Sequence, residues 1–152
     1  MTAGDEHAIH SWPSYPAEFK DLDYALREKG WLAQFPAGPT NDRIAARVGN
    51  HLVGFSILTK TGLGEAEFYI ALHPESIGRG LGKIFTRMVV QQGFEQLKLQ
   101  KIHLKVRSWH LRAIQLYEGL GFRQVGAKDL EINGKREQFI IMELDKLADH
   151  TS

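Results

Sequence analysis

Cysteine is absent from this chain of 152 residues. A disulfide framework and a catalytic thiolate are therefore both excluded. The chain also lacks any run approaching the ~18–20 apolar residues of a membrane-spanning helix, so we expect no membrane partner. Residues 1–10 include Asp5 and Glu6 but no apolar stretch, which is not the composition of a secretory signal peptide. These absences are compatible with a cytoplasmic protein, and we expect that location.

An excess of charge of either sign is lacking too. The formal net charge is +1 and the pI is about 8.0, which gives no reason to expect a nucleic-acid partner. Hydrophobic residues make up 43% of the chain, enough for a substantial core, and the length corresponds to one domain over residues 1–152. His7 and His10 have no third ligand at a matching spacing, so we predict no metal site.

Hydrophobic periodicity and turn residues predict a succession of helices and strands. Helices are expected within residues 14–33, from Leu81 onwards and over about 109–119, and strands at 43–48, 51–58, 65–72, 101–107, 122–132 and 136–144. Gly49-Asn50 and Asn133-Gly134 are hairpin signals between the first two and the last two strands. This order predicts a mixed α/β domain in which helices cover the sheet.

The most informative segment is Ile-Gly-Arg-Gly-Leu-Gly-Lys at 77–83. Glycine at every second position leaves no Cβ and tolerates positive φ, so the backbone can approach a ligand closely. The segment precedes a helix whose first-turn N–H groups lack intrahelical partners and lie at the positive end of the helix dipole. Such a place binds phosphate, and Arg79 and Lys83 add positive charge. We therefore predict a site for a phosphorylated small molecule.

Two segments together resemble the motifs of a known family. Residues 70–74 (Ile-Ala-Leu-His-Pro) followed by 78–83 (Gly-Arg-Gly-Leu-Gly-Lys) are similar to the acyl-CoA-binding motif of the GNAT N-acyltransferase superfamily. Residues 112–122 (Arg-Ala-Ile-Gln-Leu-Tyr-Glu-Gly-Leu-Gly-Phe) resemble that family's second signature, in the family's order and separation. The resemblance covers residues 43–144. It implies an α/β (α+β) domain with a mixed central sheet, splayed middle strands and helices on both faces, and it leaves residues 1–42 as an N-terminal helical, acceptor-binding region.

The resemblance also implies a set of site residues. The loop is expected to hold the CoA pyrophosphate through Gly78, Arg79, Gly80, Leu81, Gly82 and Lys83, and the preceding strand to pair with pantetheine through the backbones of Ile70, Ala71 and Leu72. This pairing requires a strand edge that is locally free. The Leu72 N–H is expected to polarise the acetyl carbonyl, Tyr117 to protonate the departing thiolate, and His110 to contact the cofactor in place of the family's Asn.

The implied activity is acetyl-CoA-dependent N-acetylation by direct transfer to a primary amine, with no metal. The acceptor is expected to be a small-molecule amine such as an amino sugar or a polyamine, and a protein N-terminus or lysine is the second choice. Family members often form homodimers, and an exposed final hairpin leaves that assembly open. Two other functions remain: a non-catalytic acyl-CoA-binding sensor, and a protein-interaction domain on the same fold.

Departures from the family pattern concern one loop residue and the general base. Ile77 stands where the family usually has Arg or Gln, but the backbone supplies the phosphate contacts. Ala66 and Lys105 occupy the two strand positions at which relatives carry a Glu that acts as the general base. Glu65 and Glu67 lie next to Ala66, yet strand alternation places them on the opposite face. The proton acceptor therefore stays open among His73, His103, a water chain and bulk solvent.

Aromatic residues in this sequence have a structural interpretation as well as a functional one. Tyr117 lies on an apolar helix face, where a tyrosine normally fills the core and finds a hydroxyl partner at its edge. Trp12, Trp31 and Trp109 are candidates for an acceptor pocket, although such residues are more often half-buried packing.

Overall fold

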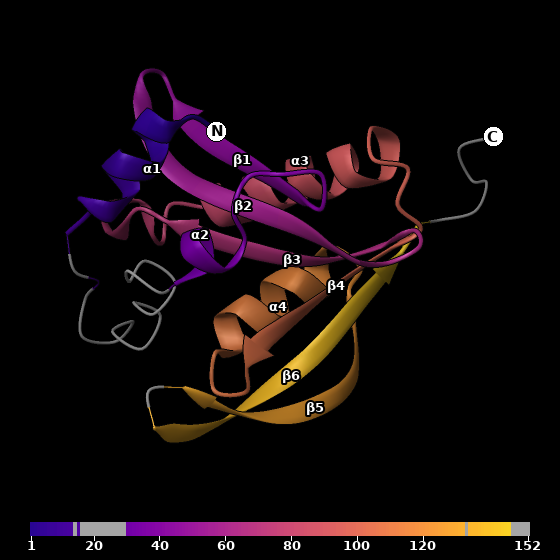
Figure 1. The fold of residues 1–152 in the computed structure, drawn as a ribbon. Helices are drawn as coiled ribbons and strands as arrows, with labels where there is room; N and C mark the ends of the chain where they lie inside the picture. Colours follow the sequence, from indigo (N-terminus) through magenta and orange to yellow (C-terminus); the bar gives the residue numbers. More distant parts are fainter. Residues whose placement is uncertain (14, 16–29, 133, 147–152) are drawn as a thin grey trace. The chain divides into compact units, whose positions relative to one another are not determined.

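The computed structural model describes residues 1–13, 15, 30–132 and 134–146 (Figure 1). Its helices are α1 (Ala3–His10), α2 (Trp31–Gln34), α3 (Leu81–Glu95) and α4 (Leu111–Gly119). Its strands are β1 (Asn41–Val48), β2 (His51–Gly62), β3 (Glu65–Leu72), β4 (Lys101–Arg107), β5 (Arg123–Ile132) and β6 (Lys135–Asp145). The helices expected within residues 14–33 lie mostly outside the described residues, and α2 is the part that is seen.

The strands form one six-stranded sheet in the order β1-β2-β3-β4-β6-β5. The β3–β4 pair is parallel, whereas β1–β2, β4–β6 and β5–β6 are antiparallel. The predicted mixed α/β class is confirmed, and six predicted strands agree with the six observed. The chain divides into two compact units, residues 1–59 with 69–89 and residues 60–68 with 90–152.

The first unit is built on the β1–β2 hairpin. Gly49 in its turn has a φ of 62°, the left-handed conformation that glycine adopts without a steric cost. The sheet buries a cluster of apolar side chains, and Ile9 of α1 and Leu32 of α2 pack into it; the other buried members are Phe55, Ile57 and Ala71. The core of this unit therefore lies between β2, β3 and the N-terminal helices.

Helix α1 was not predicted, although its start carries a recognisable signal. The Thr2 Oγ1 accepts a hydrogen bond from the Asp5 N–H at 3.1 Å, and the Asp5 carboxylate accepts one from the Thr2 N–H at 2.9 Å. This reciprocal pair is a capping box with Asp in the third helical position. The helix is short and buries only Asp5 and Ile9, so its hydrophobic periodicity is weak.

The second unit contains the first part of β3 and the strands β4, β5 and β6. The β3–β4 ladder joins Glu65, Ala66 and Glu67 to Lys101, Ile102 and His103. The β4–β6 ladder continues along the whole of β4 to Arg107. Among the described residues, β3 and β4 therefore pair only near their starts, and the part of β3 from Phe68 to Leu72 lies outside this ladder. That is the hydrogen-bonding pattern expected of middle strands that splay.

Candidate functional site

The backbone of β3 alternates between two edges, and contacts with β2 define which residue faces which edge. The Ser56 hydroxyl on β2 donates to Tyr69 O at 2.8 Å, and the His73 N–H donates to Val53 O at 2.8 Å. The N–H and C=O of one strand residue point to the same edge, and successive residues alternate. The odd-numbered residues of this segment therefore face β2.

Ala71 follows the same rule. A Cβ added to Gly54 of β2 would lie 3.0 Å from Ala71 O, so the backbones of the two strands approach closely here. The polar backbone groups of Ala71 consequently lie on the β2 side, while those of Ile70 and Leu72 point to the edge away from β2. Of the three residues predicted to pair with pantetheine, Ile70 and Leu72 have the required backbone direction and Ala71 does not.

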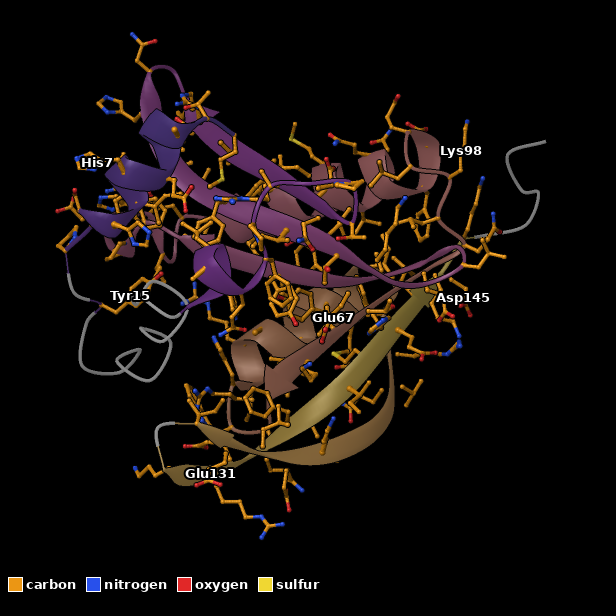
Figure 2. The ribbon with its side chains drawn as sticks, viewed as in Figure 1. His7, Tyr15, Glu67, Lys98, Glu131 and Asp145 are labelled. Atoms are coloured by element: carbon orange, nitrogen blue, oxygen red, sulfur yellow. The ribbon has the colours of Figure 1, made fainter. Side chains whose placement is uncertain are left out.

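The end of β3 is held by a side chain from the N-terminal region. The hydroxyl of Tyr15, which is labelled in Figure 2, donates to Leu72 O at 2.9 Å, and the Tyr15 side chain is buried. Because Leu72 O points to the edge away from β2, the Tyr15 hydroxyl lies on the edge to which the Leu72 N–H also points. The sequence does not predict this contact, since nothing local in it relates positions so far apart.

A short 3-10 turn, Pro74–Ser76, connects β3 to the glycine loop. Its N-cap is His73, whose Nδ1 accepts a hydrogen bond from the Glu75 N–H at 3.1 Å. A neutral imidazole that accepts at Nδ1 carries its proton on Nε2. His73 must therefore break this cap before Nδ1 can take a proton from a substrate, which disfavours His73 as the general base.

The glycine loop has the predicted backbone. The φ angles of Gly78 and Gly80 are 86° and 78°, a conformation that side chains with a Cβ rarely adopt. A Cβ built at Gly80 would contact no described atom within 4 Å. Glycine is thus required there for its conformation, and the space beside it is open to a ligand. The loop geometry fits the predicted pyrophosphate site.

Helix α3 begins directly after this loop, at Leu81. Its first-turn amides, including those of Gly82 and Lys83, have no carbonyl one turn earlier within the helix and lie at its positive end. Arg79 and Lys83 are exposed, and no carboxylate among the described residues pairs with either. Backbone donors and cationic side chains therefore gather at one exposed turn, the arrangement that binds an anion.

Tyr117 lies on the buried face of α4 in the second unit. Its ring makes edge-to-face contacts with Phe68 and Phe122, at centroid distances of 6.2 and 5.7 Å. Its side chain is 9% exposed, so the ring fills the core as the structural interpretation predicted. Such packing fixes the ring without assigning a role to the hydroxyl, and the general-acid role stays a prediction.

His110 is the N-cap of α4, one residue after the exposed Trp109 that stacks on its ring at 5.3 Å. Burial lowers the pKa of His110 below 6.5, and the neighbouring Arg112 lowers it further. Both effects disfavour the charged imidazolium. His110 is therefore neutral near pH 7 and can offer one ring N–H to a ligand. Trp12 and Trp31 instead belong to the first unit, each within 6.4 Å of the Phe55 ring.

At the two strand positions where a Glu could act as the general base, this chain has a buried alanine, Ala66, and a lysine, Lys105, that forms an ion pair. Ala66 is buried, and Lys105 Nζ lies 2.6 Å from a carboxylate oxygen of Glu67. Glu67 is itself buried, at 8% exposure, because both faces of β3 are covered at this point. Strand alternation places Glu67 on the face opposite to Ala66, as predicted. Its pairing with Lys105 depends on a strand register that the sequence does not reveal.

Three further findings concern the described residues. No group of three or more His, Cys, Asp or Glu side chains among them could hold a metal ion. None of the described helices is both long and apolar enough to cross a membrane. His103, a second candidate base, has its Nε2 2.9 Å from the Thr61 hydroxyl.

This chain matches one family model and is similar to several known proteins. The model of the Acetyltransferase (GNAT) family matches residues 6–122. The spermidine N(1)-acetyltransferase of Escherichia coli (strain K12) is 34% identical over 90 residues, which are 56% of this chain and 48% of that protein. The N-alpha-acetyltransferase RimI of Mycobacterium tuberculosis is 29% identical over 96 residues, 60% of this chain and 58% of RimI. The chain thus spans about half the length of the curated relatives it matches.

Solved structures share the fold. A spermidine N-acetyltransferase from Vibrio cholerae, in complex with CoA and spermine, superposes with a TM-score of 0.78 at 23% identity. The match covers 95% of this chain and 92% of that chain. The same enzyme's structure with manganese ions has a TM-score of 0.75 at 24% identity, covering 95% and 89% of the two chains.

Proposed function

Because the chain belongs to the acetyltransferase (GNAT) family, we propose that it transfers the acetyl group of acetyl-CoA directly to a primary amine. One observation carries the proposal: the β3 edge bearing the Ile70 and Leu72 backbone groups leads, through a single short turn, to positive-φ glycines and a helix N-terminus. An extended amide chain followed by a pyrophosphate needs these two surfaces in this order.

Binding is assigned to the first unit. The amides of residues 78–83 donate to the pyrophosphate, and the cations of Arg79 and Lys83 lie beside it. Ile70 and Leu72 pair with the pantetheine amides as a neighbouring strand would. The exposure of Gly78 and Gly80 and the open space beside Gly80 support this assignment.

The chemistry is assigned to two groups of this chain. The Leu72 N–H donates to the thioester carbonyl oxygen, where negative charge develops as the amine nitrogen attacks. The new C–N bond forms and the C–S bond breaks, so the sulfur leaves with the electron pair. Tyr117 gives its hydroxyl proton to that sulfur and regains a proton from solvent. Because no cysteine is present, an acyl-cysteine intermediate is excluded.

The acceptor must lose a proton before or during attack, and the described contacts narrow the choice of proton acceptor. His73 is engaged through Nδ1 and Glu67 is paired with Lys105. We propose that the proton leaves to His103 or to solvent water. The pH dependence of kcat/KM in His103→Gln separates the two, since loss of a histidine that acts as the base would remove the fall in rate on the acid side of the profile.

We propose a polyamine as the first choice of acceptor and a protein N-terminus as the second. The names of two relatives, spermidine N(1)-acetyltransferase and N-alpha-acetyltransferase RimI, support this proposal. We further propose that the protein acts in the cytoplasm.

If the protein forms a homodimer, we propose the exposed edge strand β5 as the contact surface. Sedimentation of a β5 variant such as Val125→Lys tests that assembly.

Calorimetry and a thiol-release assay together test the function. We expect acetyl-CoA to bind and free thiol to appear with at least one member of a panel of spermidine, amino sugars and short peptides. Binding without turnover on any amine would support the sensor instead. Failure of CoA either to bind or to raise the melting temperature would support the interaction domain.

A further inference from the structure

We infer that Tyr15 is a positioning residue for acetyl transfer, acting through the hydrogen bond from its hydroxyl to the Leu72 carbonyl. This inference rests on the proposed function, because it concerns the Leu72 N–H that polarises the thioester. The bond is 2.9 Å long, and the Tyr15 side chain is 9% exposed.

The segment that carries Tyr15 is anchored at the same end of β3. The Trp12 ring lies 5.1 Å from the His73 ring and 6.2 Å from the Phe55 ring. These contacts hold the chain just before Tyr15 against the residue that follows Leu72. Trp12, three residues before Tyr15, is therefore held next to the strand end that the Tyr15 hydroxyl contacts.

The peptide group between Leu72 and His73 is fixed at both of its polar atoms. Its N–H donates to Val53 O at 2.8 Å, and its carbonyl oxygen, Leu72 O, accepts from Tyr15. Fixing this plane limits rotation about the backbone bonds of Leu72. The direction of the Leu72 N–H, which a polarising donor must keep within a narrow range, is thereby set.

Electrostatics provide a second reason. Leu72 O and the Leu72 N–H point to the same edge of β3, so the carbonyl places partial negative charge beside the site where the acetyl oxygen becomes negative. A hydroxyl that donates to this carbonyl directs its positive end toward the same place. Removing the hydroxyl exposes the carbonyl dipole to the developing charge and raises the barrier without removing any contact with bound CoA.

The test compares Tyr15→Phe with a matched loss of a hydroxyl, Tyr69→Phe, on β3 itself. Tyr15→Phe keeps the buried ring, and we expect kcat to fall roughly tenfold, less than the ~10²–10³-fold loss from removing a direct oxyanion donor. The KM for acetyl-CoA and the dissociation constant of CoA should stay within about twofold, and Tyr69→Phe should keep kcat within about twofold. Rates are normalised to the CoA-binding sites titrated by calorimetry, so a partly unfolded sample does not mimic the effect.

Several outcomes would overturn the inference. A Tyr15→Phe protein with normal kcat, or one that loses CoA affinity instead, removes the positioning role. An equal loss of kcat in Tyr69→Phe, or a Tyr15→Phe chain that does not fold, assigns the bond to stability. Each of these leaves the proposed function intact, provided that the wild type acetylates an amine. A wild type that neither binds acetyl-CoA nor releases thiol overturns both.

Discussion

Lys105 Nζ lies 2.6 Å from a carboxylate oxygen of Glu67, and the two side chains pair across adjacent strands β4 and β3. By the family resemblance, Lys105 stands at a position where some members carry a Glu that acts as the general base. The pair places a cation there and neutralises a buried carboxylate on the neighbouring strand. Removing Lys105 takes this cation away from Glu67, a carboxylate residue that is only 8% exposed, so the loss of the pair destabilises the fold.

Lys105→Met should therefore lower the free energy of unfolding by ~2 kcal/mol, less than for a fully buried pair because the lysine side chain is 29% exposed. The double variant Glu67→Gln with Lys105→Met should recover most of this loss. The matched control is Lys101→Met. Lys101 lies on β4, as Lys105 does, and forms a more exposed pair with Glu143 of β6. Its loss should lower the free energy of unfolding by under ~1 kcal/mol. Urea denaturation measures all three, and equal losses at Lys101 and Lys105 would contradict the argument.

Gly80→Val should abolish acetyl-CoA binding, because it adds a branched side chain at the open side of the phosphate loop. Gly134→Val is an unusually close control: Gly134 has a φ of 77°, against 78° for Gly80, and no described atom lies within 4 Å of a Cβ at either position. Both variants should lose a similar stability, about 1–2 kcal/mol, from left-handed strain. Calorimetry with CoA should separate them. Normal CoA binding by folded Gly80→Val would show that the loop does not hold the pyrophosphate.

Tyr117→Phe should lower kcat by about 10²-fold with little change in KM, if the hydroxyl protonates the leaving sulfur. The aromatic contacts with Phe68 and Phe122 survive this change, so the melting temperature should move little. Steady-state kinetics with the preferred amine measure the effect. A variant with unchanged kcat would leave Tyr117 with only its packing role.

Acid should destabilise the N-terminal helix through Asp5. The hydrogen bond from the Thr2 N–H, followed by that from Arg47, lowers the pKa of Asp5 from 3.8 to about 2. Because the folded-state pKa is the lower one, this stabilisation is complete above pH ~4 and is lost as the pH falls from about 4 to 2. Asp5→Asn should be less stable at neutral pH and should lose this part of the pH dependence. Melting curves between pH 2 and pH 6 test this, with Glu6→Gln as a control from the same helix.

Strand prediction succeeded wherever the signal was local. The bounds 65–72 and 101–107 agree with β3 and β4, since alternation and apolar runs mark a strand without reference to its neighbours. Helix α4 begins at Leu111 rather than near Trp109, because His110 takes the cap position. Strand β2 runs to Gly62, further than its apolar pattern, because pairing with neighbours holds polar residues in the sheet.

At the candidate site, too, the sequence predicted only the features that depend on local signals. Conformational freedom at Gly78 and Gly80 was predicted from residue type, and both adopt positive φ. Which of residues 70–72 presents its amide to a ligand could not be predicted, because that depends on the edge to which β2 pairs. Contacts with β2 show that the backbone groups of Ala71 face β2, whereas those of Ile70 and Leu72 point to the other edge.

By itself, the sequence determined the chemistry that a short stretch of chain can carry. The absence of cysteine closed one reaction route, and alternating glycines ahead of a helix predicted a phosphate loop, because both depend only on residue type and local spacing. Tertiary structure alone decided which distant groups meet: Tyr15 with Leu72, and Glu67 with Lys105. Such meetings depend on strand register and on packing between segments far apart in the chain, and no local pattern encodes either.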